Sequence, residues 1–447
     1  MRVISLAEVA RLFGCLGSFP SLSVHGYSTD SRQIKTGELF FALNGERVDG
    51  HSYLRQVQKK GAIGAVVSKN FREDISGFPL LRVDDPLYSL QKLAKHALAK
   101  HPTRVVAITG SLGKTTTKEF TKALLSTKYR VSASPGNHNS QVGLPLAILN
   151  HTTGKEDICV LEMGMTLPGQ IQKLIEIAPP DVAVITTTAL VHACNFNSIE
   201  DIGYSKGEIF LHPKTRVGIL CRDIANFAAI SALGNCKKIS FSTNSPNADY
   251  YCNPSEPYHL HSLQEQVNCT LQTSALPGKH NLHNLLAAIT IARCYNIEWS
   301  EIINAIPSIA LPDLRLQFIR HRDIIFLNDS YNAAEVSVKA ALEALPQPPP
   351  EGRKIAVLGS MLELGRFSVD CHRRVGAFAL NHVEHMYCLG EECLPICEEW
   401  KKAGRPVHFF YHRAELVACL RNQLKAKDVV LLKGSRSKEL WKVIEEL

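Results

Sequence analysis

The stretch Arg104–Leu125 (RVVAITGSLGKTTTKEFTKALL) restricts the possible folds of this chain more than any other segment. It begins with the apolar run 105–108, which is typical of a strand buried on both faces of a sheet. Gly110 and Gly113 then predict a turn, and from Thr115 onward apolar residues recur at helical spacing. A buried strand, a glycine-bearing turn and a helix in this order indicate an α/β protein with a parallel sheet.

The same turn has the residue types of a phosphate-binding loop. Backbone N–H groups and the positive end of the helix point toward an anion, Lys114 supplies a charge, and the Thr115 hydroxyl can bind a metal ion. The match to G-x-x-x-x-G-K-[ST] is partial, because Ile108 stands where the first glycine would be. An ordinary βα turn is the alternative. Given the flanking strand and helix, we predict a nucleotide site. Its residues are Gly110, Ser111, Gly113, Lys114, Thr115 and Thr116.

Two more predicted strands lead to polar side chains. Residues 157–162 (DICVLE) and 181–187 (DVAVITT) are short apolar runs, with Glu162 ending the first and His192 following the second. Ligands of parallel sheets gather at the carboxyl ends of the strands, so Glu162 is placed to bind a metal ion opposite Thr115. An exposed strand-end carboxylate and a structural histidine are the alternatives at these two positions.

Lys206 lies in an apolar frame between Ile202 and Ile209. Burying an ammonium group is costly and lowers its pKa. A neutral buried amine can react with carbon dioxide to give a carbamate, an anion that binds metal ions. The sequence does not show whether this modification is present.

Apolar spacing predicts a helix around 280–289 (HNLHNLLAAI). His280 and Asn284, four residues apart, share a face that can present polar atoms to a base or a sugar. N-capping by Asn281 is the alternative. Earlier in the chain, the loop 134–145 (SPGNHNSQVGLP) is rich in amide and imidazole groups, and such loops position ligands or cap helices.

The length of 447 residues suggests about three domains. Pro102 and the segment 307–312 mark the predicted boundaries. We expect a small N-terminal α/β domain (1–101), a central nucleotide-binding domain with a parallel sheet (102–312) and a C-terminal domain (313–447). Strands alternate with helices in the C-terminal domain, which predicts a doubly wound, Rossmann-like sheet.

The N-terminal domain contains two unusually polar segments, 29–32 (TDSR) and 44–51 (NGERVDGH). Glycine, serine and arginine are ordinary turn residues. The same residues also suit a diphosphate, which backbone N–H groups and a bidentate guanidinium can bind. The sequence leaves both interpretations open.

Composition argues against several other classes. The formal net charge of +8 comes from scattered basic residues, without the basic or aromatic stripe of a nucleic-acid-binding face. The thirteen cysteines lack paired C-x-x-C spacing and are expected to be reduced thiols. The N-terminus does not read as a signal peptide, and no apolar run approaches the ~20 residues of a membrane span. We expect a cytoplasmic enzyme that binds neither nucleic acid nor a membrane.

Taken together, the motifs resemble the Mur ligases of bacterial peptidoglycan synthesis. The shared segments follow the family's order and cover nearly the whole chain: DSRQIKTGELFFALNGERVDGH, TGSLGKTT, GNHNSQVGLP, VLEMG, YSKGEIF, GKHNLHNLLAA, NDSYNA, VLGSMLELG and LLKGSR. KGEIF, DSYNA and LLKGSRS are most similar to the branch that joins D-alanyl-D-alanine to UDP-N-acetylmuramoyl-tripeptide. The branch that adds the third amino acid has D-x-A-H-x-P-D where this chain has DSYN at 329–332, and folylpolyglutamate synthases lack the amino-terminal segment.

The resemblance implies a monomeric, ATP- and Mg²⁺-dependent ligase that converts a carboxylate to an acyl phosphate, with the third domain closing over the site and binding D-alanyl-D-alanine. The implied catalytic groups are Lys114, Lys206 and His192. ATP would contact the predicted loop together with His280, Asn284, Arg315 and Asp329. The implied metal ligands are Thr115, Glu162, His192 and carbamylated Lys206. The implied substrate contacts are Asp30, Ser31, Arg32, Asn44, Asp49, Gly50, His51, Asn137, His138, Asn139, Tyr331 and Asn332.

The chain departs from the family pattern at four positions. Ala334 and Glu335 replace an Asn and a Pro, Leu314 replaces a Gly, and Ser360 replaces an Asp. These changes affect the expected dipeptide site and hinge more than the expected chemistry. Another Mur or folate-type ligase and a nucleic-acid-stimulated ATPase are the competing functions, and the choice between diaminopimelate and lysine in the acceptor stays open.

Overall fold

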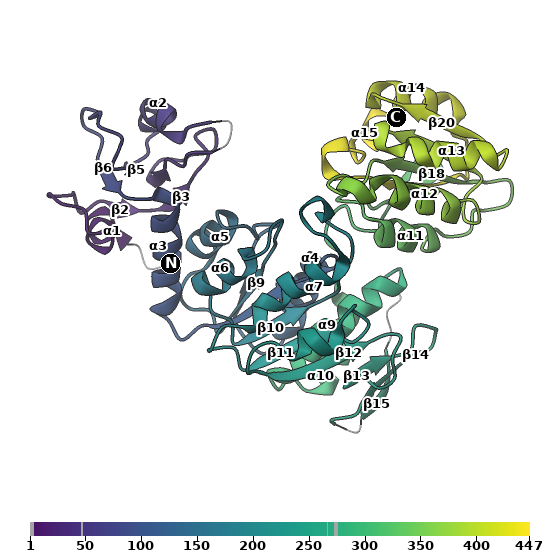
Figure 1. Ribbon diagram of the computed structural model, residues 1–447, viewed down its shortest axis with the longest axis horizontal. Coiled ribbons are helices and arrows are strands. Elements are labelled where there is room, and N and C mark those ends of the chain that lie inside the picture. The colour runs from purple at the N-terminus through teal and green to yellow at the C-terminus, as the bar shows by residue number, and fades with distance from the viewer. Residues whose placement is uncertain (1–3, 46–47, 266, 272–275) are drawn as a thin grey trace.

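Figure 1 shows three α/β units, coloured purple, teal and green to yellow in chain order. This computed structural model describes residues 4–45, 48–265, 267–271 and 276–447. The units have main sheets of four, nine and six strands, respectively. The α/β fold class is therefore confirmed, while the domain boundaries at 101 and 312 stay a prediction.

The N-terminal unit is built on a parallel sheet of order β3-β4-β5-β6. Helix α1 (Leu6–Phe13) is N-capped by Ser5, whose hydroxyl accepts a hydrogen bond from the Glu8 N–H. Its C-cap is Gly14, which has a left-handed backbone conformation. The strands are β1 (Ile4–Ser5), β2 (Ser23–Val24), β3 (Gly26–Ser28), β4 (Glu38–Phe41), β5 (Gly64–Ser68) and β6 (Leu80–Val83), and the remaining helices are α2 (Leu54–Lys59) and α3 (Pro86–Ala99).

The central unit has the strand order β15-β14-β13-β12-β11-β10-β7-β9-β8. Its strands are β7 (Arg104–Thr109), β8 (Val131–Ala133), β9 (Ile158–Glu162), β10 (Val182–Ile185), β11 (Val217–Cys221), β12 (Lys237–Ser242), β13 (Tyr250–Cys252), β14 (Tyr258–Ser262) and β15 (Val267–Leu271). Its helices are α4 (Lys114–Leu125), α5 (Gly143–His151), α6 (Gln170–Ile177), α7 (Ile199–Gly207), α8 (Phe227–Ser231), α9 (Lys279–Cys294) and α10 (Trp299–Ala305).

This sheet differs from the prediction of a parallel sheet at one edge. Strand β14 pairs antiparallel with both β13 and β15. The connections between these strands are short, and a short connection can join only antiparallel neighbours. At the other side of the sheet, Ile108 of β7 is level with Glu162 of β9 and with Val184 of β10. The residues that follow these parallel strands therefore share one edge.

The C-terminal unit has the order β16-β17-β21-β18-β19-β20, parallel except for the edge strand β16. This arrangement confirms the predicted doubly wound sheet. Its strands are β16 (Gln317–His321), β17 (Ile324–Asn328), β18 (Lys354–Gly359), β19 (His385–Leu389), β20 (Val407–Phe410) and β21 (Val429–Lys433). Its helices are α11 (Glu335–Glu343), α12 (Ser368–Ala379), α13 (Leu394–Lys402), α14 (Arg413–Gln423) and α15 (Lys442–Glu446).

The strand predicted over 105–108 is completely surrounded by other side chains and lies in the core of the central unit. All thirteen cysteines are free thiols. Within the described ranges, none of the helices is both long and apolar enough to cross a membrane.

Candidate active site

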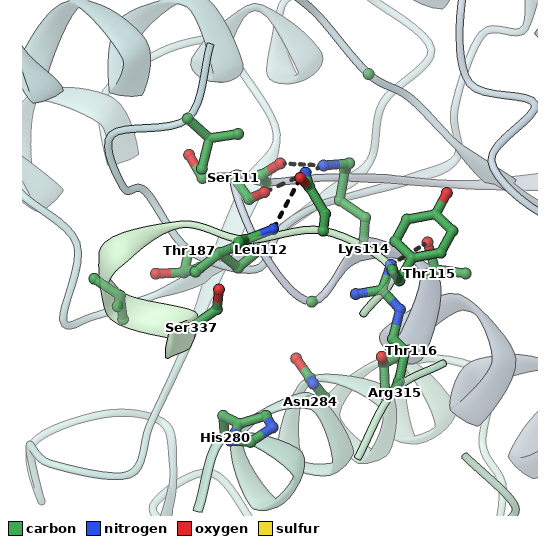
Figure 2. A pocket seen from close by; sticks show the side chains of 18 of the residues that line it. Ser111, Leu112, Lys114, Thr115, Thr116, Thr187, His280, Asn284, Arg315 and Ser337 are labelled. Carbon is green, nitrogen blue, oxygen red and sulfur yellow. Dashed lines mark hydrogen bonds between the residues drawn. The ribbon is translucent and has the colours of Figure 1, made fainter. Parts of the chain in front are cut away.

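A cavity of about 1030 Å³ lies between the central and C-terminal units. Its central wall includes the turn after β7, the end of β9 and the start of α9, and residues between 315 and 437 form its C-terminal wall. Figure 2 shows part of both walls, with Ser111, Leu112 and Lys114 on the turn and Arg315 close to Thr115. Because both walls contribute, the complete cavity exists only when the two units are together.

Two glycines of the turn leave room for side chains that pack against its backbone. At Gly110 (φ 151°) a Cβ atom would lie 1.9 Å from the Thr186 hydroxyl oxygen. At Gly113 (φ 80°) it would lie 2.2 Å from the Asn284 side-chain oxygen. Glycine avoids both clashes and tolerates the left-handed conformation. The turn is therefore held tightly between β10 and α9, as a rigid loop.

Lys114 lies in the wall of the cavity, at the first position of α4. Its Nζ donates to the Gly110 carbonyl oxygen at 2.8 Å, so the side chain folds back over the turn (Figure 2). Desolvation lowers the pKa of Lys114, Glu162 opposes this shift, and the Arg315 charge adds to it. An ammonium placed at the positive end of a helix, together with a second cation, favours a polyanion as ligand.

Glu162 connects two segments predicted to bind ligands. One of its oxygens accepts a hydrogen bond from the Thr115 hydroxyl at 2.7 Å, and the other accepts from Asn139 Nδ2 at 2.7 Å. Its side chain is buried at the end of β9. A hydroxyl and a carboxylate are hard oxygen donors of the kind that Mg²⁺ prefers beside substrate phosphates. These residues therefore fit a magnesium ion.

His192 and Lys206 line the same cavity. His192 has a left-handed backbone (φ 55°), and its Nδ1 hydrogen-bonds with the carboxylate of Glu363 from the C-terminal unit. With Nδ1 engaged in this way, Nε2 is the nitrogen free for a metal. Lys206 is 4% exposed, and desolvation, reinforced by the charge of Lys114, lowers its pKa well below the usual value.

His280 and Asn284 lie on α9 (Figure 2), and the Asn284 side chain packs against Gly113 of the turn. Among the described residues, His280 Nδ1 is buried without a hydrogen-bond partner, and burial lowers the pKa of this side chain to about 4. A neutral imidazole with an unused buried nitrogen suits an uncharged polar ligand group such as a base. The capping alternative for Asn281 is wrong, because α9 is capped by Gly278 and Asn281 Nδ2 donates to the Pro277 carbonyl.

The C-terminal wall carries both cationic and acidic side chains. The guanidinium of Arg315 lies 4.3 Å from the centre of the Tyr331 ring, and that of Arg436 lies 5.0 Å from it. Asp329 is paired with Lys433, whose Nζ is 2.5 Å from the carboxylate, and also accepts from the Leu316 N–H at 3.2 Å. This carboxylate is therefore positioned by the protein before any ligand binds.

The structure accommodates the departures from the family pattern. Leu314 adopts φ 59°, a conformation that is costly for a residue with a Cβ. Glu335 begins α11, where a carboxylate interacts favourably with the helix dipole, and pairs with Lys339 and Arg374. The Ser360 hydroxyl donates to Glu392 at 2.5 Å.

The N-terminal segments lie at a different sheet edge. Asp30 and Asn44 follow the neighbouring parallel strands β3 and β4, which places them at the carboxyl edge of the N-terminal sheet. The backbone N–H and the guanidinium of Arg32 both donate to the Asp30 carboxylate. The backbones of Asn44 and Asp49 form an isolated antiparallel β-bridge. The remaining predicted contacts there are Ser31, Gly50 and His51; Glu46 and Arg47 of the second segment lie outside the described residues.

The 137–139 segment is only partly in the cavity. Asn137 and Asn139 belong to its described lining, and His138 does not. Tyr331 and Asn332 line it from the C-terminal side. The expected role of His138 in substrate binding thus stays a prediction.

Sequence reasoning assigned no role to several cavity residues, among them Glu363, Lys433 and Arg436. Each of these three lies inside a quoted segment, VLGSMLELG or LLKGSR. Lys433 ends the buried strand β21, and a lysine at the end of an apolar run was the available signal.

Family models match three parts of the chain. Residues 23–96 match the model described as Mur ligase family, catalytic domain, residues 108–292 the Mur ligase middle domain, and residues 314–436 the Mur ligase, glutamate ligase domain. The chain is also 32% identical over 455 residues to UDP-N-acetylmuramoyl-tripeptide--D-alanyl-D-alanine ligase of Bacillus subtilis (strain 168), with 100% of this chain and 98% of that protein covered.

Two solved structures are similar over nearly the whole length. MurF from Acinetobacter baumannii superimposes with a TM-score of 0.88 at 26% identity, covering 100% of this chain and 99% of that one. MurF ligase from Thermotoga maritima in complex with ADP gives a TM-score of 0.79 at 28% identity, covering 95% and 97%.

Proposed function

The chain belongs to the Mur ligase family, and on that premise we propose that it is an ATP-dependent ligase that joins D-alanyl-D-alanine to UDP-N-acetylmuramoyl-tripeptide. The observation that supports this most directly is the cavity between two units, with Lys114 and Arg315 on opposite walls and the Thr115–Glu162 pair between them. Full-length similarity to ligases of that name supports the choice of substrates.

The reaction has two steps. The terminal carboxylate of the tripeptide attacks the γ-phosphorus of ATP, which gives an acyl phosphate and ADP. The amine of D-alanyl-D-alanine then attacks the acyl carbon, forming the amide and releasing phosphate and a proton. A carboxylate is a poor electrophile, so the first step supplies the leaving group that the second step needs.

The charged residues of the cavity would act by neutralising the negative charge on the phosphate oxygens of ATP. Phosphoryl transfer depends on positioning and on neutralising the oxygens around the transferred group. Lys114 and Arg315 would bind those oxygens from the two walls, and His280 with Asn284 would bind the adenine end of ATP. Mg²⁺ held by Thr115 and Glu162 would add charge neutralisation. Enclosure between the two units would keep water from the acyl phosphate.

Lys206 would hold a second ion together with His192 after carbamylation. In that modification the neutral amine attacks carbon dioxide, a C–N bond forms, and a proton leaves to solvent. Burial and the nearby Lys114 charge both favour the neutral amine that this requires. The product replaces a neutral amine with an anion beside His192, which gives this position a group that can bind a metal ion.

We assign the uridine nucleotide end of the acceptor to the N-terminal edge around Asp30, Arg32, Asn44 and Asp49. We also assign the enzyme to the cytoplasm as a monomer, and the thirteen free thiols support a reducing compartment. Domains divided at 101 and 312 would let the C-terminal unit close over the cavity, as the contribution of both units to its walls suggests.

Phosphate release tests the assignment. The chain, ATP and Mg²⁺ are combined with UDP-N-acetylmuramoyl-tripeptide, with and without D-alanyl-D-alanine. Turnover is expected only when both are present. The matched control supplies the dipeptide precursor with diaminopimelate or lysine; turnover there would move the enzyme one step earlier. Turnover stimulated by RNA or DNA without a sugar nucleotide would overturn the proposal.

A further inference from the structure

Cys221, Asp223 and His283 bring three different metal-binding groups together in the wall of the cavity. One ligand atom from each residue lies within 4.8 Å of the other two. Cys221 ends β11, Asp223 follows in the next turn, and His283 is on α9. Strand β10 separates β11 from β7, so this cluster is distinct from the Thr115–Glu162 pair.

His283 is held in the form that binds metals. Its Nε2 lies 3.0 Å from the Thr186 carbonyl oxygen, which can only accept, so Nε2 carries the proton and Nδ1 has the free lone pair. Metal-binding histidines commonly donate their other N–H to a carbonyl in this way. Burial lowers the pKa of His283, and the Phe241 ring packs against it with centroids 4.9 Å apart. The imidazole is therefore neutral and fixed.

Asp223 is equally well positioned. The Ser242 hydroxyl lies 2.7 Å from one carboxylate oxygen, and Asn244 Nδ2 donates to the other at 3.2 Å. Supporting contacts of this kind orient the ligands of metal sites. The Cys221 thiol lies 3.8 Å from the same carboxylate, and its sulfur accepts from the Asp223 N–H at 3.3 Å.

The thiol itself is protonated without a metal, because burial and the Asp223 charge raise the pKa of Cys221. A coordinating cation deprotonates a thiol, and the proton leaves to solvent. The bound cation then offsets the repulsion between the Cys221 thiolate and the Asp223 carboxylate.

From this geometry we propose that Cys221, Asp223 and His283 form a binding site for Zn²⁺ or a similar borderline-soft divalent cation. Thiolate, imidazole and carboxylate together are typical zinc ligands, whereas Mg²⁺ prefers oxygen. Three protein ligands leave the fourth tetrahedral position for water or for a ligand atom in the cavity. The site does not depend on the proposed ligase activity.

Cobalt binding tests the site directly, because Co²⁺ takes zinc positions and is coloured. The full-length, reduced, metal-free chain is titrated with Co²⁺ in excess Mg²⁺ while visible absorption is recorded. We expect one ion per chain with thiolate-to-cobalt charge-transfer absorption, displaced by Zn²⁺, which binds more tightly in the usual order. Absence of that absorption at millimolar Co²⁺ would overturn the proposal.

Variants identify the ligands. Cys221→Ser should remove the charge-transfer absorption, and His283→Gln, which keeps a donor for the Thr186 carbonyl, should weaken Co²⁺ binding by about tenfold or more. Cys194→Ser is the matched control, since Cys194 is the exposed thiol near His192. Absorption that survives in Cys221→Ser, or disappears in Cys194→Ser, would contradict the assignment. If Cys221→Ser does not fold, the His283→Gln titration decides.

Discussion

The two walls of the cavity are held in place by different kinds of contact. The central wall is built largely on loops that follow strands of one sheet. Glu162 accepts hydrogen bonds from Thr115 and from Asn139, and the pairing of β7 with β9 aligns the loops that follow these strands. The C-terminal wall meets it through a few contacts between units. These are Arg315 with Thr115, Glu363 with His192 and with the Cys194 N–H, and Arg366 with the Asn197 carbonyl.

This difference indicates separate roles. The Thr115–Glu162–Asn139 part of the central wall is joined by hydrogen bonds within the central unit, whereas His192 is also held by Glu363 of the other unit. The position of the C-terminal wall depends on how the two units pack together, so substitutions there should show whether the units close over the cavity. Substitutions in the central wall should therefore remove chemistry, while those in the C-terminal wall should weaken assembly of the site. The following predictions test this contrast, beginning with the largest expected effect.

Lys114→Met should lower the rate of ligation by at least about 10³-fold, because it removes a preorganised positive charge from the transferred phosphoryl group. Folding should be retained, since the substitution also removes a desolvated ammonium. Phosphate release and thermal unfolding are the measurements. Lys122→Met, an exposed lysine on the same helix, is the control and should behave like the unchanged chain. Equal activity in both variants would contradict the role of Lys114.

Lys206→Ala should abolish ligation while ATP binding stays measurable, because the variant loses the carbamate but keeps the turn. Short carboxylic acids should restore part of the activity by supplying an anion in the vacated space. Lys214→Ala, which removes a half-exposed lysine, is the control and should respond neither way. Full activity in Lys206→Ala would remove the carbamate from the mechanism.

Glu363→Gln should lower kcat/KM by about 10- to 100-fold, the usual cost of losing a group that orients a metal-binding histidine. The Mg²⁺ concentration needed for half-maximal activity should rise as well, which a purely structural role would not cause. Glu391→Gln, an exposed position of the same unit, is the control. An unchanged Mg²⁺ requirement would show that the contact with His192 does not position it.

Glu335 allows a test of stability rather than of catalysis, because it has no proposed role in the reaction. Burial raises the pKa of its carboxyl, but hydrogen bonds from Arg374 and Lys339 outweigh this and hold the pKa at about 2, below the ordinary 4.5. A depressed folded-state pKa stabilises the protein above the unfolded value, and the gain is lost as pH falls toward 2.

Glu335→Gln should therefore reduce the free energy of unfolding by about 1 kcal/mol at pH 7, given partly exposed partners, and by less as the pH approaches 2. Urea unfolding at several pH values measures this. Glu415→Gln, at an exposed position, serves as the control and should show no such pH dependence. A loss that is the same at all pH values would mean that the charge of Glu335 is not what stabilises the fold.

The fold and much of the candidate site could be predicted because their signals are local. Apolar runs placed β7, β9 and β10 close to their observed bounds, and Glu162 could be placed at a strand end because parallel strands end at a common edge. The turn at 110–113 was predictable for the same reason: glycines between a buried strand and a helix mark a turn whose backbone takes up conformations that other residues rarely adopt.

The sequence by itself thus determined most of the central elements, the glycine turn after β7 and the family. Tertiary structure alone decided which distant side chains meet: Glu363 with His192, Lys433 with Asp329, and His283 with Cys221 and Asp223. It also decided that β14 and β15 turn back as antiparallel strands. Hydrophobic periodicity shows which face of one segment packs against the core. These contacts depend instead on how segments far apart in the sequence pack together, and the spacing of residues along the chain does not determine the distance between such segments.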